Sequence, residues 1–417
     1  MRFRVAQIRA ITAVLGVVLT APVLAQTAPD PDKAEGFRIE NDVTLKLGLD
    51  RNYRSSNARS EVTDLFGEAE LVSKFSFGGD LSVQSKLHWE RVKVPTGEDR
   101  VFGSHGLYVE NLFLEYAFDD SRVQAGKFNP NFGMGWDDAR LPGFYANEFA
   151  KDYQTKEAIG VGFGHEADFA SFGQHKMDAA LFFLDNTALS HSALNSPVYG
   201  PGQGAISTTL RPGRNRLSYG GPGNTASPQS IALQYEVSEP AGIEGLTLAG
   251  GYRFLKAGSR QPATLQAATG AVGSRNSHGY VAGGRYEIAL PGDVTLTPFL
   301  EWAKFTDIFN ADPAIGLNQF KDRSYLTSAL IIGWKDFTLV GSRMTRTFAR
   351  PDNENTAGAF YNQEDRQIGA NLLYKLIDDL TLGIGYRKVR AAPATGDTDR
   401  QAKTESVGFQ AVYQISF

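Results

Sequence analysis

The chain has 417 residues, no cysteine and a formal net charge of −4, which becomes about −7 once the three arginines of residues 1–25 are set aside. The absence of cysteine excludes a disulfide-stapled scaffold and a Cys-ligated metal site, and the negative charge argues against nucleic acid as a partner. No stretch after the first 25 residues approaches about 18 consecutive apolar residues, which excludes helical membrane spans. A soluble all-β protein or a membrane barrel remains.

Residues 1–25 have the pattern of a secretory signal peptide. Three arginines precede an apolar run at residues 10–20, and small residues ending at Ala25 offer a cleavage site before Gln26. The apolar run is shorter than the about 20 residues that a membrane-spanning helix needs. We therefore expect an exported protein in which a short N-terminal segment, residues 26–36, precedes the first strand.

From residue 37 onward, segments of about ten residues alternate apolar and polar side chains, as strands of a transmembrane barrel do. Near the end of the chain, for example, Val407 and Phe409 alternate with Gly408 and Gln410. Strands of a soluble sandwich are typically shorter, at about 5 or 6 residues. Sixteen such segments are found, at residues 37–50, 61–77, 81–94, 107–118, 122–129, 157–165, 176–185, 228–238, 246–256, 277–290, 294–306, 322–334, 337–349, 365–377, 380–390 and 403–417.

The links between these segments alternate in length. Short links such as Gly78-Gly79-Asp80 are rich in turn residues, and aromatic residues such as Phe77, Tyr116 and Trp334 stand beside them. Long polar links lie between them, at about 51–60, 95–106, 130–156, 186–227, 257–276, 307–321, 350–364 and 391–402. We therefore predict an all-β fold, a transmembrane antiparallel β-barrel of sixteen strands, residues 37–417, with short periplasmic turns and long external loops. Its last strand should pair with its first, because an open edge in hydrocarbon leaves backbone groups unsatisfied.

The whole pattern resembles the Gram-negative outer-membrane porin superfamily. Residues 123–133, Val-Gln-Ala-Gly-Lys-Phe-Asn-Pro-Asn-Phe-Gly, are similar to the Gly-Gln-Phe-x-x-Pro-Phe-Gly run of its phosphate-selective porin O and P branch, with the proline one place earlier and an asparagine inserted. The resemblance implies localisation in the cell outer membrane, contact with outer-membrane lipids and lipopolysaccharide, and a homotrimer. It also implies that the terminal Phe417 is part of a signal read by the barrel-assembly machinery, so that its deletion impairs assembly and leaves selectivity unchanged.

The link at residues 130–156 is the candidate constriction of the pore. Loops of this length are usually functional, its glycines and aromatics suit a compact fold, and the third loop of porins commonly folds inward. An ordinary solvated loop is the alternative. The charged candidates in this constriction loop are Asp137, Asp138, Arg140, Glu148, Lys151 and Asp152.

Strand alternation also predicts which charged side chains face the lumen. If the apolar residues of a strand face lipid, their neighbours face inward, since charge on the lipid face is costly near the midplane. For each such residue a structural ion pair with a neighbouring strand is the alternative to a contact with solute, and bulges reverse the alternation, as Glu110 and Arg343 indicate. The inward candidates are Lys46, Lys74, Lys86, Glu115, Arg253, Arg285, Glu301, Lys375 and Arg387.

Nothing in the sequence indicates an enzyme, a cofactor or a metal site. Neither Gly-x-Ser-x-Gly nor His-Glu-x-x-His occurs, and the six histidines show no ligand spacing. Two functions stay open: a porin for passive diffusion of small polar or anionic solutes and ions, and a substrate-specific channel with a lumen site for phosphate, carboxylate or sugar. In the link 186–227, Arg211, Arg214 and Arg216 could attract anions at the mouth, with a mobile surface loop as the alternative.

Overall fold

The structure is a computed structural model that describes residues 36–92, 97–192, 217, 221–258, 276–312, 317–349, 363–391 and 402–417. Within these ranges no helix combines the length and the apolar character needed to cross a bilayer. Residues 1–25, for which a signal peptide is predicted, lie outside the described residues, as do most of the segment 26–36 and the three arginines of the link 186–227, so the expectations for them stay predictions.

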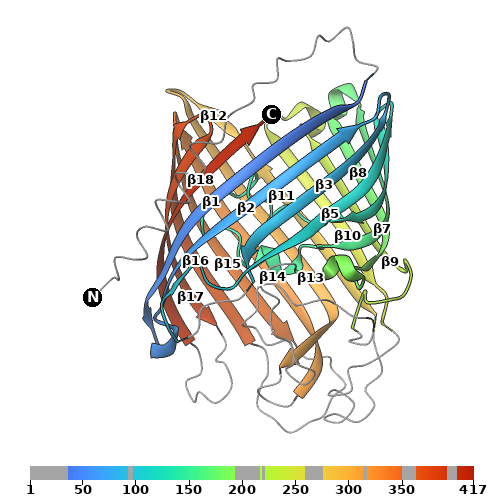
Figure 1. Ribbon diagram of the computed structural model, residues 1–417. Coiled ribbons are helices and arrows are strands. Elements are labelled where there is room, and N and C mark those ends of the chain that lie inside the picture. Colours follow the sequence, from blue (N-terminus) through green and yellow to red (C-terminus); the bar gives the residue numbers. More distant parts are fainter. Residues whose placement is uncertain are drawn as a thin grey trace.

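The described strands form one sheet that closes on itself as a tilted cylinder (Figure 1). Its first strand, β1 (Arg38–Ser55), pairs antiparallel with its last, β18 (Ala402–Ser416), from Asp42 opposite Ser416 to Ser55 opposite Thr404. Every strand therefore has two neighbours, and no row of backbone N–H and C=O groups is left at an open edge. The predicted closure of the barrel is confirmed.

The barrel wall has sixteen strands, as predicted. β11 (Ser277–Tyr286) and β12 (Ile288–Leu290) both pair with β13 (Val294–Asp312) and form one wall strand that is interrupted at Glu287. The two-residue β4 (Arg100–Val101) lies in the link after β3 and pairs in parallel with β2. The other wall strands are β2 (Thr63–Ser76), β3 (Leu81–Arg91), β5 (His105–Phe118), β6 (Ser121–Phe128), β7 (Ala158–Asp168), β8 (Gln174–Leu184), β9 (Ser230–Ser238), β10 (Leu246–Leu255), β14 (Leu317–Trp334), β15 (Phe337–Ala349), β16 (Gln363–Ile377) and β17 (Leu380–Ala391).

The short turns gather at one end of the cylinder, the upper end in Figure 1, as the alternation of link lengths predicted. Two of them hold the single-turn helices η4 (Ala170–Phe172) and η7 (Pro240–Gly242). The prediction of a long link at 307–321 was wrong. β13 and β14 stay paired as far as Asp312 opposite Leu317, past a register shift between Phe305 and Ile308, because backbone pairing in a hairpin continues without a buried face once the strands are aligned.

The outer wall is apolar and the inner wall is polar. On β16, for example, Ile368 exposes 56% of its surface on the outside, while the next residue inward, Gln367, is fully buried. Apolar surface of this extent is not left in water by soluble monomers. The aromatic residues beside the short turns lie exposed on the outer wall, among them Phe77, Tyr116, Phe118, Tyr286, Trp334 and Phe337.

The hydrophobic core lies inside the barrel. One cluster joins Phe132 and Tyr153, from the link between β6 and β7, to Phe305, Tyr325 and Met344 of the wall. A second joins Met134, Leu141 and Ala146 of the same link to Phe299 and Val340 of the wall. A sixteen-strand barrel is too wide for its own side chains to fill, and here a loop supplies the filling.

Candidate functional site

The link between β6 and β7, residues 129–157, folds into the lumen and makes contacts on opposite sides of the barrel. We call residues 130–156 the inner loop. It leaves β6, packs against β13, crosses to β16, β17 and β1, and returns through the single-turn helix η3 (Ala150–Tyr153) to β7.

The first anchor of the inner loop is Glu301 on β13, which is 1% exposed. Its carboxylate accepts hydrogen bonds from the backbone N–H of Met134 at 2.5 Å, from that of Gly135 at 2.8 Å and from the Tyr153 hydroxyl. Three donors from the loop therefore converge on one buried carboxylate. Gly133 turns the chain here with φ +79°, a conformation that favours glycine.

The second anchor holds Tyr145 at the far side of the lumen. Its hydroxyl donates to Asp50 of β1 at 2.7 Å, and its backbone N–H donates to Asn371 Oδ1 of β16 at 3.2 Å. Burial raises the pKa of the Tyr145 phenol far above its usual range, so the hydroxyl stays a neutral donor. Gly143 allows the close approach, since a Cβ there, at φ +128°, would lie 2.7 Å from Asn371 Cγ.

Two carboxylates of the inner loop are paired with arginines of the wall. Glu148 pairs with Arg387 of β17, whose guanidinium also lies 3.5 Å from Asp50 and over the ring of Tyr145. Asp152 pairs with Arg346 of β15. Each pair joins the loop to a strand about 200 residues away in the sequence, so the loop is held by charge as well as by packing.

Asp138 and Lys151 form an ion pair within the inner loop, with 3.0 Å between Oδ1 and Nζ. Enclosure by the barrel acts to raise the pKa of Asp138, but the Lys151 ammonium, the Asn147 amide and the Lys46 ammonium together outweigh it, and the pKa falls below its usual value. Enclosure likewise acts to lower the pKa of Lys151, but the carboxylates of Asp138, Glu68 and Glu148 together outweigh it and raise that pKa. Both groups are therefore charged at neutral pH, and the Asp138 side chain keeps 67% of its surface exposed.

Arg140 ties the middle of the inner loop to β9. Its guanidinium lies 2.7 Å from Glu236 of that strand and 3.3 Å from Asp137 three residues earlier. The six charged loop residues that the sequence singled out are thus each engaged in an ion pair. Asp138 keeps the most exposed of the four loop carboxylates, and Asp137 and Asp138 both have ion-pair partners inside the loop itself.

The wall formed by β1, β2 and β3 carries the inward lysines. Lys46 lies 3.0 Å from Glu68 and over the ring of Phe144, 5.7 Å from its centroid, which brings it to the inner loop. Lys86 lies 2.7 Å from Glu70, and Lys74 shares a strand face with Glu70 by alternation. On the next strand Glu115 accepts a hydrogen bond from Gln84 at 2.8 Å.

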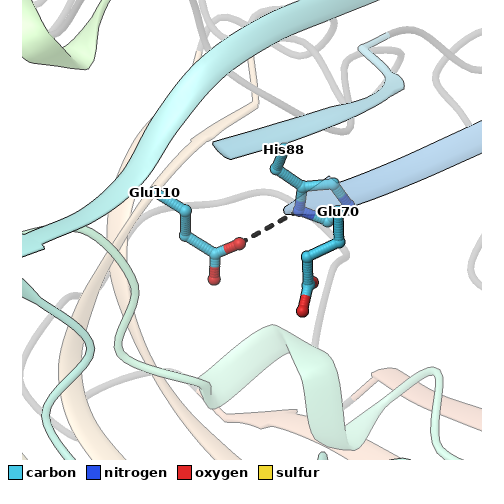
Figure 2. Close-up of side chains that lie close together, drawn as sticks. All are labelled: Glu70, His88 and Glu110. Atoms are coloured by element: carbon cyan, nitrogen blue, oxygen red, sulfur yellow. Dashed lines mark hydrogen bonds and ion pairs between the residues drawn. The ribbon is translucent and has the colours of Figure 1, made fainter. Parts of the chain in front are cut away.

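Glu70, His88 and Glu110 meet on the same wall, from three adjacent strands (Figure 2). Their ligand-type atoms lie within 4.8 Å of one another, and His88 Nδ1 lies 3.0 Å from Glu110. The ammonium of Lys86 already stands 2.7 Å from Glu70 and 3.7 Å from Glu110, in the place that a bound cation would take. The arrangement is an ion-pair network.

A β-bulge explains why Glu110 does not fit strict alternation. Lys86 stands opposite Asn111 and Leu87 opposite Val109, so Glu110 is the extra residue of β5 and turns inward. Arg343, the other exception, lies exposed on the outer face of β15 between the inward-facing Ser342 and Met344.

Of the remaining inward candidates, Arg253 contacts the inner loop, and Arg285 and Lys375 lie away from it. Arg253 on β10 donates to the backbone oxygen of Tyr153, at the return of the loop. Arg285 pairs with Glu287 at 3.2 Å and Lys375 with Asp378 at 2.8 Å, both near the short-turn end and away from the loop contacts.

Phe417 is paired with the first strand through its backbone. Its N–H donates to Asn41 O at 2.9 Å, and its carbonyl accepts from Asn41 N at 2.8 Å, while its side chain is 66% exposed. The ladder between β1 and β18 therefore continues to the last residue.

Sequence reasoning missed the partners that hold the inner loop, chiefly Asp50, Arg346, Asn371 and Glu236. Asp50 stands at an inward position of a predicted strand and could have been found by alternation from Lys46. Arg346 could not, because Arg343 disturbs the alternation on the same segment.

Comparison with known proteins shows the fold. Neither a family model nor a curated protein matches the chain. Salmonella typhi OmpF in complex with daunomycin superimposes with a TM-score of 0.54 at 11% identity, over 92% of this chain and 99% of that one. The outer membrane channel DcaP of Acinetobacter baumannii gives 0.52 at 12%, over 91% and 97%, and the trimer form of OmpT of Vibrio cholerae gives 0.50 at 12%, over 91% and 100%. The chain thus has the closed sixteen-strand barrel fold of these bacterial proteins.

Proposed function

We propose that this chain is an outer-membrane porin through which small polar solutes and ions diffuse passively, and that the inner loop forms the constriction of its pore. One observation carries the proposal: the loop is anchored on both sides of the lumen, at Glu301 on β13 and at Asp50 on β1. A loop held across a wide barrel narrows the passage, and charges on it select among solutes.

The two faces of the wall support this proposal. An apolar outer face with aromatic residues near the turns fits hydrocarbon and its interface with water. An inner face of Lys, Glu, Gln, Asn and Arg side chains suits contact with water. A barrel of this strand number is wide enough for an aqueous channel, and a protein with the same fold is described as an outer membrane channel.

The cellular setting belongs to the same proposal. A signal peptide at residues 1–25 exports the chain, the barrel-assembly machinery reads the segment that ends at Phe417, and the barrel lies among outer-membrane lipids and lipopolysaccharide. A homotrimer is the assembly that we propose, and the trimer form of OmpT supports it by its fold.

The inner loop also sets the charge of the constriction. Its exposed carboxylate Asp138 and its half-buried carboxylate Asp137 belong to a lumen whose other walls carry Lys46 and Arg387. At a Debye length of about 8 Å in physiological salt, charges in a narrow lumen are only partly screened. The resulting transverse field sorts solutes by charge and dipole.

A substrate-specific channel for a carboxylate, phosphate or sugar is the second candidate function. A cavity between the inner loop and β10 to β14, with Arg253 in its lining, favours it over a featureless pore. Passive diffusion remains the primary proposal because the charged groups of the constriction already have ion-pair partners within the protein.

Planar-bilayer recording tests the proposal. The purified protein should insert in discrete steps whose conductance rises in proportion to salt concentration, with a reversal potential across a KCl gradient that reports its ion preference. Saturable block of the current by a phosphate, carboxylate or sugar would support the substrate-specific channel instead. Protein that retains β-structure in detergent and yet gives no current steps contradicts both.

A further inference from the structure

A cavity of about 280 Å³ lies beside the return of the inner loop. Asp152 of the loop, Arg253 and Leu255 of β10, Phe305 of β13, and Arg323 and Tyr325 of β14 are among the residues that line it. The lining thus combines two arginines and one aspartate with aromatic and aliphatic surface. Clefts with an apolar lining and a few convergent polar groups are the usual form of small-molecule sites.

Arg253 is the unusual member of this lining. It is 8% exposed, and its described hydrogen bonds use Nη1 alone, to the Tyr153 carbonyl oxygen at 3.0 Å and to Thr155 Oγ1 at 2.8 Å. The guanidinium lies 4.8 Å from the ring centroid of Phe305 and 5.0 Å from that of Phe132. All of these partners are neutral.

No carboxylate among the described residues lies within ion-pair distance of Arg253. Other inward arginines differ: Arg346 pairs with Asp152, Arg387 with Glu148, and Arg122 with Asp178. Burying a charge without a counter-charge is costly. The desolvation cost of burying the Arg253 guanidinium is offset if an anion from outside the chain binds next to it.

The charge of the cavity points the same way. Asp152 is the one carboxylate among the lining residues, and it is already engaged by Arg346 of β15. The Tyr325 hydroxyl donates a hydrogen bond to the same carboxylate at 3.4 Å, so Asp152 has its partners within the protein. Asp152 therefore supplies no counter-charge to Arg253, which lines the cavity without an ion-pair partner among the described residues.

We propose that this cavity binds a small organic anion, with its carboxylate at Arg253 and its planar apolar body against Phe305, Tyr325 and Leu255. A guanidinium presents N–H donors in a planar fork that matches a carboxylate, and aromatic walls favour a flat body over a bare ion such as inorganic phosphate. The inference rests on the second candidate function, the substrate-specific channel, and deepens it by naming the class of solute that the lumen binds.

Isothermal titration calorimetry on the detergent-solubilised full-length protein tests the site, with benzoate as the probe. Three solutes serve for comparison. Benzyl alcohol has the planar body but no charge, and acetate has the carboxylate but no planar body. Inorganic phosphate has charge but neither the carboxylate nor the planar body. Benzoate should bind saturably and more tightly than all three. A Kd for phosphate equal to or below that of benzoate would overturn the assignment to organic anions.

Three variants locate the binding. Arg253→Gln keeps an amide donor for Tyr153 and removes the charge, and it should weaken benzoate about tenfold or more, as loss of a charged hydrogen bond does. Leu255→Trp fills the cavity without touching Arg253 and should weaken it comparably. Arg122→Gln, at an inward arginine paired with Asp178, is the matched control and should leave the Kd unchanged.

The outcomes separate the two proposals, because calorimetry needs no ion current. Absence of benzoate binding, or binding that survives both Arg253→Gln and Leu255→Trp, overturns the anion site even if the bilayer shows a conducting pore. Binding that depends on Arg253 and Leu255 in a protein that never conducts upholds the site, and the proposed channel function is then the one that fails.

Discussion

The barrel wall and the inner loop are stabilised in opposite ways. In the wall, backbone hydrogen bonds run along every strand pair, and each side chain mainly has to suit the face on which it lies. In the inner loop, single side chains carry the contacts: Glu301 accepts three hydrogen bonds, and Tyr145 is held by Asp50 and Asn371. The wall is therefore tolerant of substitution at most positions, and the loop is sensitive at a few.

The difference also separates two roles. Under the proposed function, the wall carries the chain through the membrane and the loop selects the solutes that pass. Variants of the loop should therefore change current and leave assembly intact.

Deletion of residues 134–150 is expected to have the largest effect on the pore. It removes the segment that crosses the lumen, and single-channel conductance should rise roughly twofold or more, because a barrel of this strand number encloses an aqueous channel when nothing fills it. Heat-modifiable migration on gels and the β-sheet circular dichroism spectrum should stay those of the intact barrel. If the deletion variant inserts normally with unchanged conductance, the pore is narrowed elsewhere.

Glu301→Gln is expected to loosen the loop without removing it. Hydrogen bonds to a charged acceptor are worth about 1.5–3 kcal/mol each, and a neutral amide weakens all three at Glu301. We expect local opening to become easier by about 2 kcal/mol, a rise of roughly 30-fold in the opening equilibrium. Hydrogen exchange at the amides of Met134 and Gly135, which donate to this carboxylate, measures it directly.

Glu115→Gln is the matched control for this change. Glu115 is also an inward glutamate of the wall, but its described hydrogen bond comes from Gln84 of the neighbouring strand rather than from the loop. Its substitution should leave exchange at Met134 and Gly135 unchanged. Equal protection of these amides in both variants would mean that Glu301 does not anchor the loop.

Asp137→Asn combined with Asp138→Asn is expected to give the smallest of the three effects. It leaves Lys151 without its partner and Arg140 with Glu236 alone, so the loop becomes more positive by two charges. The reversal potential should move toward anion preference, with the permeability ratio changing roughly twofold, because the lumen screens these charges only partly.

The matched control replaces two acids at the opposite end of the barrel, Asp378→Asn with Asp379→Asn, in the turn between β16 and β17. This double variant should have the same reversal potential as the unmodified protein. Identical shifts from both pairs would show that the potential follows the overall charge of the chain, and the loop would lose its special role.

The wall could be predicted from the sequence because its rules are local. The alternation of apolar and polar residues, such as Val407 and Phe409 with Gly408 and Gln410, is visible in the sequence itself. Turn residues mark the points where the chain reverses direction. The predicted ends of two strands were wrong: β13 and β14 continue through residues 307–312 and 317–321. Backbone pairing in an aligned hairpin does not require the alternation of apolar and polar residues on which the prediction relied.

The contacts of the inner loop could not be predicted in the same way. Charged residues in 130–156 were visible, but their partners lie far away in the sequence: Glu148 and Arg387 are 239 residues apart, and Asp152 and Arg346 are 194 apart. A single sequence carries no signal for such pairs. Alternation could place Arg387 and Glu301 on the inner face, and only the folded barrel shows that the loop meets them there.

The far anchor of the inner loop has a consequence for how the barrel folds. Most wall strands pair with a neighbour in the chain, whereas the seam between β1 and β18 joins residues as far apart as Asp42 and Ser416, a separation of 374. Closing such a span costs about 3 kcal/mol more chain entropy than a ten-residue hairpin, so we expect the seam to form late.

Loop residues contact the strands around this seam. Tyr145 donates to Asp50 of β1, Glu148 pairs with Arg387 of β17, and Phe144 lies so near Gly408 of β18 that a Cβ there would come within 2.4 Å of its ring. The inner loop therefore joins strands on both sides of this seam, and we expect its contacts to stabilise the closed barrel.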